Sequence, residues 1–215
     1  QDGSFRVRAM GRDIDLRVSV MPSVHGEDAV IRILDKQAMI EAHGRLTLEA
    51  LGFEAESLAM LRDLLEAPYG MMLVTGPTGS GKTTTLYAAL RLLNDGSRNI
   101  LTVEDPIEFV HTSQKCLINQ REVHRDTHGF NEALRSALRE DPDYILVGEL
   151  RDLETIRLAL TAAETGHLVF GTLHTSSAAK TIDRIIDVFP AGEKPMVRSM
   201  LSESLRAVIS QALLK

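Results

Sequence analysis

One glycine-rich segment has the residue types and spacing of a phosphate-binding loop. Its sequence, Gly76-Pro77-Thr78-Gly79-Ser80-Gly81-Lys82-Thr83, fits the pattern G-x-x-x-x-G-K-[ST]. In such a loop, glycines let backbone N–H groups converge on an anion, and the following helix adds partial positive charge. Lys82 would reach the β- and γ-phosphates of a nucleotide, and the Thr83 hydroxyl would ligate Mg²⁺. A plain glycine-rich turn is the alternative, but the spacing and the flanking segments favour nucleotide binding. The nucleotide-binding candidates of this segment are Gly76, Pro77, Thr78, Gly79, Ser80, Gly81, Lys82, Thr83 and Thr84.

Carboxylates follow two apolar runs that are typical of core strands. Glu149 comes after the run 144–147, so we expect it beside the phosphate loop, holding Mg²⁺ or its water shell. A second acidic cluster, residues 104–108, follows the run 100–103. Hydrolysis needs a positioned base or water-orienting group, and a glutamate of this cluster could supply it. The alternatives are a helix-capping carboxylate for Glu149 and a solvated charged loop for the cluster.

Two histidines and four arginines are further candidates. His167 and His174 lie at the two ends of the apolar run 168–173, and His174 could sense the γ-phosphate by a hydrogen bond. Arginine forks stabilise the charge that develops in phosphoryl transfer, either within a chain or from a neighbour. The alternative for any arginine is an exposed surface position that contributes only to solubility. The arginines considered are Arg17 and Arg32, on N-terminal strands, and Arg135 and Arg139, four apart on one helix face.

The expected elements place these residues in an α/β fold. Strands alternate with helices after the phosphate loop, which predicts a mainly parallel sheet with crossover helices. We expect residues 1–36 to be the C-terminal remnant of a β-rich, α+β domain, 37–55 a linker, and 56–215 a C-terminally truncated RecA-like P-loop domain. The predicted strands are 5–10, 14–20, 29–34, 71–74, 99–103, 144–147 and 168–173. The predicted helices are 56–66, 84–90, 130–140, 153–164 and 177–188, with one or two more over 194–214; residues 109–111 and 116–120 are expected to form an antiparallel flap.

Composition narrows the class of protein. The 215 residues carry a formal net charge of −6 and are 44% hydrophobic, as in an ordinary globular protein, and the acidic balance disfavours a nucleic-acid platform. The single cysteine, Cys116, cannot form an intrachain disulfide or a cysteine-rich zinc site. No apolar run is long enough to span a bilayer, so we expect a cytoplasmic location with membrane contact through partners only.

Taken together, the motifs resemble those of the motor ATPases of type II secretion and type IV pili, the GspE/PilB/PilT superfamily. The resemblance rests on the Walker A loop 76–83, the Asp box 101–108, the Walker B run 145–149 and the His box 171–175, in family order. It implies ATP and Mg²⁺ as ligands, a cytoplasmic homo-hexamer, and an inner-membrane platform protein of a pilus or secretion machine as partner.

The resemblance also implies roles for single residues. Lys82, Glu108, Glu149 and His174 would form the catalytic set, with Glu108 as the catalytic glutamate and Glu149 as the Walker B acid. Thr83 and Glu149 would hold the metal, and His167 would lie near the nucleotide. Arg17 and Arg32 would come from the domain that closes over the phosphate, and Arg135 and Arg139 match basic positions associated with the same site.

Three alternatives stay open in the sequence. The first third resembles the extension and secretion branch, whereas residues 107–204 resemble the retraction branch. A nucleic-acid translocating ring ATPase could share this core, but it should carry a basic, aromatic-bearing loop, and only 4% of the residues are aromatic. A non-hydrolysing regulatory subunit is disfavoured by the intact Lys82, Glu108 and Glu149.

Overall fold

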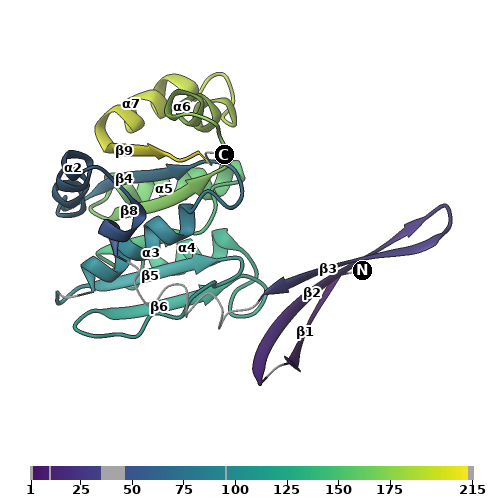
Figure 1. The fold of residues 1–215 in the computed structure, drawn as a ribbon. Coiled ribbons are helices and arrows are strands. Elements are labelled where there is room, and N and C mark those ends of the chain that lie inside the picture. Colours follow the sequence, from purple (N-terminus) through teal and green to yellow (C-terminus); the bar gives the residue numbers. More distant parts are fainter. Residues whose placement is uncertain (1, 10, 35–46, 95, 213–215) are drawn as a thin grey trace. The chain divides into compact units, whose positions relative to one another are not determined.

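The chain divides into two units, residues 1–45 and 46–215, in a computed structural model. The structure describes residues 2–9, 11–34, 47–94 and 96–212. The first unit is an antiparallel sheet in the order β1-β2-β3, coloured purple to blue in Figure 1. Its strands are β1 (Asp2–Ala9), β2 (Arg12–Ser23) and β3 (Gly26–Leu34). The predicted β-rich N-terminal segment is confirmed, and the β2–β3 pairing extends beyond the predicted strands to Ser23 and Gly26.

The second unit is built on one parallel sheet of six strands. Their order is β6-β5-β7-β8-β4-β9, and every neighbouring pair is parallel (Figure 1). The strands are β4 (Gly70–Thr75), β5 (Asn99–Glu104), β6 (Leu117–Glu122), β7 (Tyr144–Val147), β8 (Leu168–Leu173) and β9 (Leu205–Ser210). The central strands are buried along their whole length, as expected when helices cover both faces. The predicted α/β class and parallel sheet are therefore confirmed.

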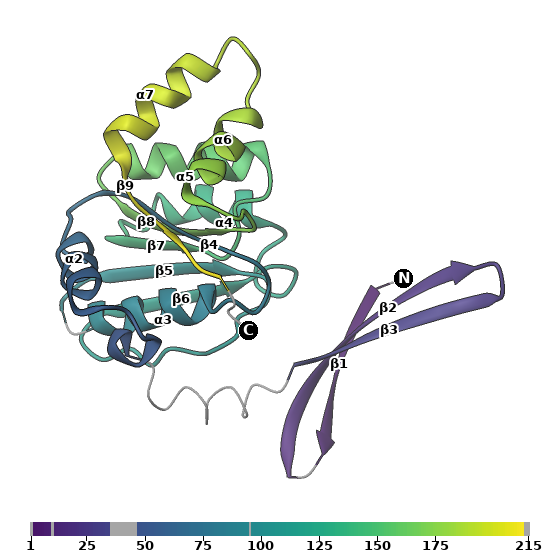
Figure 2. The same cartoon turned by 45° about the horizontal axis from the view of Figure 1, so that its top comes forward.

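The helices form a layer on each face of this sheet (Figure 2). One layer contains η1 (Leu48–Leu51), α2 (Ala55–Leu65) and α3 (Lys82–Leu93). The other contains α4 (Phe130–Ala137), α5 (Leu153–Glu164), α6 (Ala178–Asp187) and α7 (Lys194–Ser204). Strand alternation serves both layers: Met71 and Leu73 of β4 pack in the α5 layer, whereas Met72 and Val74 pack in the α3 layer.

Two expectations about single elements are wrong. Residues 116–120 do not form an antiparallel flap with 109–111; β6 instead joins the sheet edge parallel to β5, with Ile118 opposite Ile100. The helical segment expected over 194–214 ends at Ser204, and β9 then pairs with β4. The β-branched Val208 and Ile209 fit this half-buried strand, whose pairing satisfies the second edge of β4.

The expected linker 37–55 is described only from residue 47 onward. There η1 forms a single 3-10 turn, and Leu48 is buried with α2 and α3. Within the described ranges, no helix combines the length and apolarity needed to cross a membrane.

Candidate functional site

The glycine-rich loop connects the buried strand β4 to helix α3. Gly76 has φ of 150°, a conformation that L side chains rarely adopt, and a Cβ there would lie 2.3 Å from the carbonyl oxygen of Gln211. Gly81 precedes the helix with φ of 88°. The first N–H groups of a helix have no carbonyl of their own helix to bind, and here they open onto the loop. The local geometry is that of an anion site.

Lys82 folds back into this loop. Its Nζ donates to the carbonyl oxygens of Gly76 at 2.8 Å and Pro77 at 2.9 Å, and lies 3.4 Å from Nδ1 of His174. Burial lowers the pKa of Lys82, and the carboxylates of Glu149 and Glu108 oppose that shift. An ammonium can only donate, so Nδ1 of His174 accepts and its proton is carried on Nε2.

Glu149 lies on the other side of His174. Its Oε1 is 3.6 Å from Nε2 of His174, and its Oε2 is 2.6 Å from a guanidinium nitrogen of Arg151. The hydrogen bond to Glu149 raises the pKa of Arg151. Lys82, His174, Glu149 and Arg151 therefore form a continuous polar row where the strands end. Arg151 was not among the sequence candidates, although its position two residues after the Walker B acid could have suggested it.

Thr75 holds the His174 segment beside the phosphate loop. Its Oγ1 accepts from the backbone N–H of Thr175 at 3.0 Å, and it lies 2.7 Å from the Thr175 carbonyl and 2.5 Å from the Thr175 hydroxyl. The Thr175 hydroxyl in turn is 2.6 Å from that of Thr181 on α6. Thr75 was not among the sequence candidates, because in the sequence it is only a threonine directly before the loop. In the structure its side chain is buried.

Gln211 closes the same loop from β9. Its backbone N–H donates to the carbonyl of Thr75 at 2.8 Å, and its side-chain amide donates to Thr85 Oγ1 at 2.8 Å. It thereby joins the end of β9 to both β4 and α3. Sequence reasoning missed Gln211 because it placed this residue in a helix.

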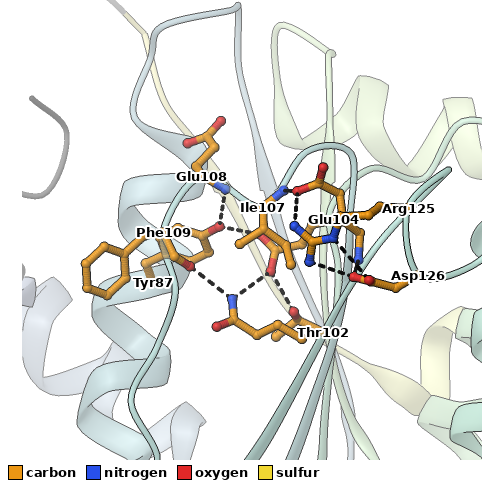
Figure 3. Close-up of polar contacts among 10 residues, drawn as sticks. Tyr87, Thr102, Glu104, Ile107, Glu108, Phe109, Arg125 and Asp126 are labelled. Carbon is orange, nitrogen blue, oxygen red and sulfur yellow. Dashed lines mark hydrogen bonds and ion pairs between the residues drawn. The ribbon is translucent and has the colours of Figure 1, made fainter. Parts of the chain in front are cut away.

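The two glutamates of the Asp box have different surroundings (Figure 3). Glu104 is 3% exposed and accepts hydrogen bonds from the hydroxyls of Tyr87 and Thr102 and from the Gln120 amide. Burial raises the pKa of Glu104, and these three hydrogen bonds oppose the increase. Glu108 donates its backbone N–H to Tyr87, while its carboxylate points away from this cluster and acts electrostatically on Lys82. Of these two glutamates, Glu108 is the one whose charge acts on Lys82 of the phosphate loop.

Other sequence candidates are not brought to the loop within this unit. His167 precedes β8, at the opposite end of the strand from His174, with Nδ1 3.0 Å from the Ala162 carbonyl. Arg135 forms an ion pair with Glu154 at the start of α5. Arg139 is exposed beyond the end of α4. The backbone carbonyl of the next residue, Glu140, accepts a hydrogen bond from the side-chain amide of Asn99. Asn99 begins β5, so this contact lies at the edge of the sheet opposite the phosphate loop.

Arg17 and Arg32 belong to the first unit. They lie directly opposite each other across the β2–β3 pairing. The site described in the second unit does not include them.

The loop residues fit a nucleotide with Mg²⁺. Ser80 Oγ is buried and, among the described residues, has no hydrogen-bond partner, which a phosphate oxygen would supply. In the described part of the chain, no group of three His, Cys, Asp or Glu side chains could hold a metal alone. Thr83 and Glu149 would offer one hydroxyl and one carboxylate, which suits Mg²⁺ because that ion keeps waters and takes phosphate oxygens as ligands.

Comparisons with known proteins agree with this geometry. The sequence model of the family described as "Type II/IV secretion system protein" matches residues 1–215. The chain is 62% identical over 215 residues to the "Type IV pilus retractation ATPase PilT" of Pseudomonas aeruginosa, covering 100% of the chain and 58% of that protein. It is 49% identical over 216 residues to the "Type II secretion system protein HxcR" of the same organism, covering 100% of the chain and 43% of that protein.

A solved structure gives the same result for the fold. The crystal structure of the pilus retraction motor PilT with bound ADP superposes with a TM-score of 0.82 at 44% identity, covering 99% of this chain and 59% of that one. The chain thus spans less than two thirds of the length of these relatives.

Proposed function

Because the chain belongs to the family of type II/IV secretion system proteins, we propose that it hydrolyses ATP with Mg²⁺ as part of a pilus or secretion motor. The observation that carries this proposal is the position of Lys82. Its ammonium lies between the carbonyls of the phosphate loop and the strand-end row of His174 and Glu149, with Glu108 also acting on it. A bound triphosphate would have cationic, hydrogen-bonding and acidic groups in one place.

The residues divide the chemistry among them. Loop N–H groups and Lys82 would bind the β- and γ-phosphates, and Thr83 and Glu149 would hold Mg²⁺, which would supply positive charge to neutralise the phosphates. Glu108 orients the attacking water and takes its proton as the bond to the γ-phosphorus forms and the bond to the ADP oxygen breaks. His174 donates its Nε2 proton toward the γ-phosphate or Glu149.

Residues that lie away from the phosphate loop in this structure, together with neighbouring subunits, complete the proposal. Arg17, Arg32, Arg135, Arg139 and His167 would contribute when domains or neighbouring subunits close over the nucleotide, in a homo-hexamer. Movement of rigid domains would transmit the free energy of hydrolysis to an inner-membrane platform protein, at the cytoplasmic face of that membrane.

The direction of movement that we favour is pilus retraction. The relative named as a retraction ATPase is 62% identical to this chain, against 49% for the secretion protein HxcR, over the same residues. A nucleic-acid translocase gains no support from these relatives, whose names refer to pili and secretion.

Two substitutions test the hydrolysis. In the full-length protein that contains this chain, Lys82→Ala should abolish phosphate release and weaken ADP binding. Glu108→Gln should lower release by about 100-fold or more while ADP binding persists, because the carboxylate acts in chemistry rather than in binding. Lys180→Ala, at an exposed position on α6, is the matched control. Unchanged turnover in the Glu108→Gln protein would refute the mechanism, and hydrolysis stimulated by added DNA would favour a translocase.

A further inference from the structure

Tyr87 connects the phosphate-loop helix to the Asp box. It lies on α3, which begins at Lys82, and is 1% exposed. Its hydroxyl donates to Oε2 of Glu104 and accepts the backbone N–H of Glu108 at 3.2 Å (Figure 3). One buried oxygen therefore touches both glutamates of the box.

The donor of each hydrogen bond between Glu108, Tyr87 and Glu104 can be identified. A backbone N–H can only donate, so the Tyr87 oxygen accepts from Glu108 and its own proton goes to Glu104. Burial, followed by the charge of Glu104, raises the pKa of Tyr87, which keeps the hydroxyl protonated. Thr102, at 2.6 Å, and the Gln120 amide, at 3.3 Å, also donate to Glu104 and hold its carboxylate in place. The hydroxyl of Tyr87 thus has one orientation.

The rest of the Asp-box loop is attached to β6. Gln120 donates to the carbonyl of Phe109 at 3.0 Å and accepts from the backbone N–H of His111 at 2.6 Å. Glu122 accepts from the backbone N–H of Ile107 at 3.1 Å. Backbone groups on both sides of Glu108 are therefore bound to β6, while Glu108 itself is bound to the phosphate-loop helix through Tyr87.

We propose that Tyr87, oriented by Glu104, is a positioning residue that sets the location of the Glu108 carboxylate relative to the γ-phosphate. Lys82 and Tyr87 lie on the same helix, α3. The lysine that would bind phosphate and the tyrosine that supports Glu108 therefore belong to one rigid element. A shift of about 1 Å in a catalytic group can reduce a rate by on the order of 100-fold, so this support matters for turnover. The inference rests on the proposed role of Glu108 in hydrolysis.

Tyr87→Phe removes the hydroxyl and retains the ring. In the full-length protein, we expect kcat for ATP to fall about tenfold or more, with KM and ADP affinity changed less than about twofold. The matched control is Tyr69→Phe, because Tyr69 is 41% exposed and lies just before β4. Glu104→Gln provides a second variant should Tyr87→Phe fold poorly, since it preserves shape and should also lower kcat without affecting ADP affinity.

Combining the substitution with Glu108→Gln separates positioning from general stabilisation. If Tyr87 acts through Glu108, Tyr87→Phe or Glu104→Gln will change the residual turnover of the Glu108→Gln protein less than about twofold. The inference would be overturned if Tyr87→Phe lowered turnover by the same factor in the wild-type and Glu108→Gln proteins. It would also be overturned if Tyr87→Phe left the kcat of the otherwise wild-type protein unchanged. If Glu108→Gln alone leaves turnover intact, the proposed function itself is refuted, and that result is distinct from either of the others.

Discussion

His111 packs edge-on against two aromatic rings in the second unit. Its ring centroid is 4.8 Å from that of Tyr87 and 5.2 Å from that of Phe109. Its Nε2 is buried and has no hydrogen-bond partner among the described residues. Burial lowers the pKa of His111 from 6.5 to about 4, because a charged imidazolium would lose its hydration there.

The sign and size of the effect on stability follow from this shift. The unfolded chain takes up the His111 proton near pH 6.5 and the folded protein only near pH 4, so the contribution of His111 is complete above pH 6.5. It is lost as the pH falls through that interval. With each pKa unit worth about 1.4 kcal/mol, the loss amounts to about 3 kcal/mol of the free energy of unfolding.

Urea unfolding of wild type and His111→Gln at a series of pH values measures this contribution. The sequence contains no tryptophan, so far-UV circular dichroism is the suitable signal. Carboxylates titrate in the same range, and Glu104, with its raised pKa, acts in the opposite sense. The quantity to compare is therefore the free energy of unfolding of wild type minus that of His111→Gln. This difference should fall by about 3 kcal/mol between pH 7 and pH 4.

A second variant serves as the control for this experiment. His128 is exposed, and His128→Gln should leave the acid sensitivity of the protein in place because His111 is intact. A constant difference between wild type and His111→Gln across the pH range would refute the reasoning, since it would mean that His111 takes up its proton equally easily in both states.

Thr75→Val should lower the free energy of unfolding by about 1–2 kcal/mol and reduce ATP turnover about tenfold, because it removes the hydroxyl that binds Thr175 beside His174; Thr75→Ser should restore both quantities. Wild-type turnover in Thr75→Val would contradict this support of His174. Gly76→Ala should lower the free energy of unfolding by more than about 2 kcal/mol in urea, because its Cβ would meet the Gln211 carbonyl at 2.3 Å. A stability equal to that of wild type would show that β9 can move away from the loop.

The features that could be predicted from the sequence are those set by neighbouring residues. The phosphate loop depends on glycines, a lysine and two flanking elements that are contiguous in the chain, so pattern and structure agree over β4 and α3. The acids Glu108 and Glu149 were expected at the strand ends because parallel strands end at one edge of a sheet. For the same reason His167 is a weak candidate, since it precedes its strand whereas His174 follows it.

The remaining features depend on contacts between distant segments. β9 lies within the stretch 194–214 for which helices are predicted, whereas the strand is selected by an open position beside β4. Nor does any local pattern indicate that Tyr87 contacts Glu104, or that Glu108 rather than Glu104 acts on Lys82 of the loop. These assignments require knowledge of which strand neighbours which.

The closure of the phosphate loop by Gln211 has a consequence for biosynthesis. Thr75 and Gly76 are synthesised well before Gln211, whose backbone pairs with Thr75 and packs against Gly76. A chain still emerging from the ribosome would have the whole glycine-rich motif and yet no finished site. Pairing over so long a sequence separation also slows folding. The nascent protein should therefore acquire affinity for nucleotide only after β9 has joined the sheet.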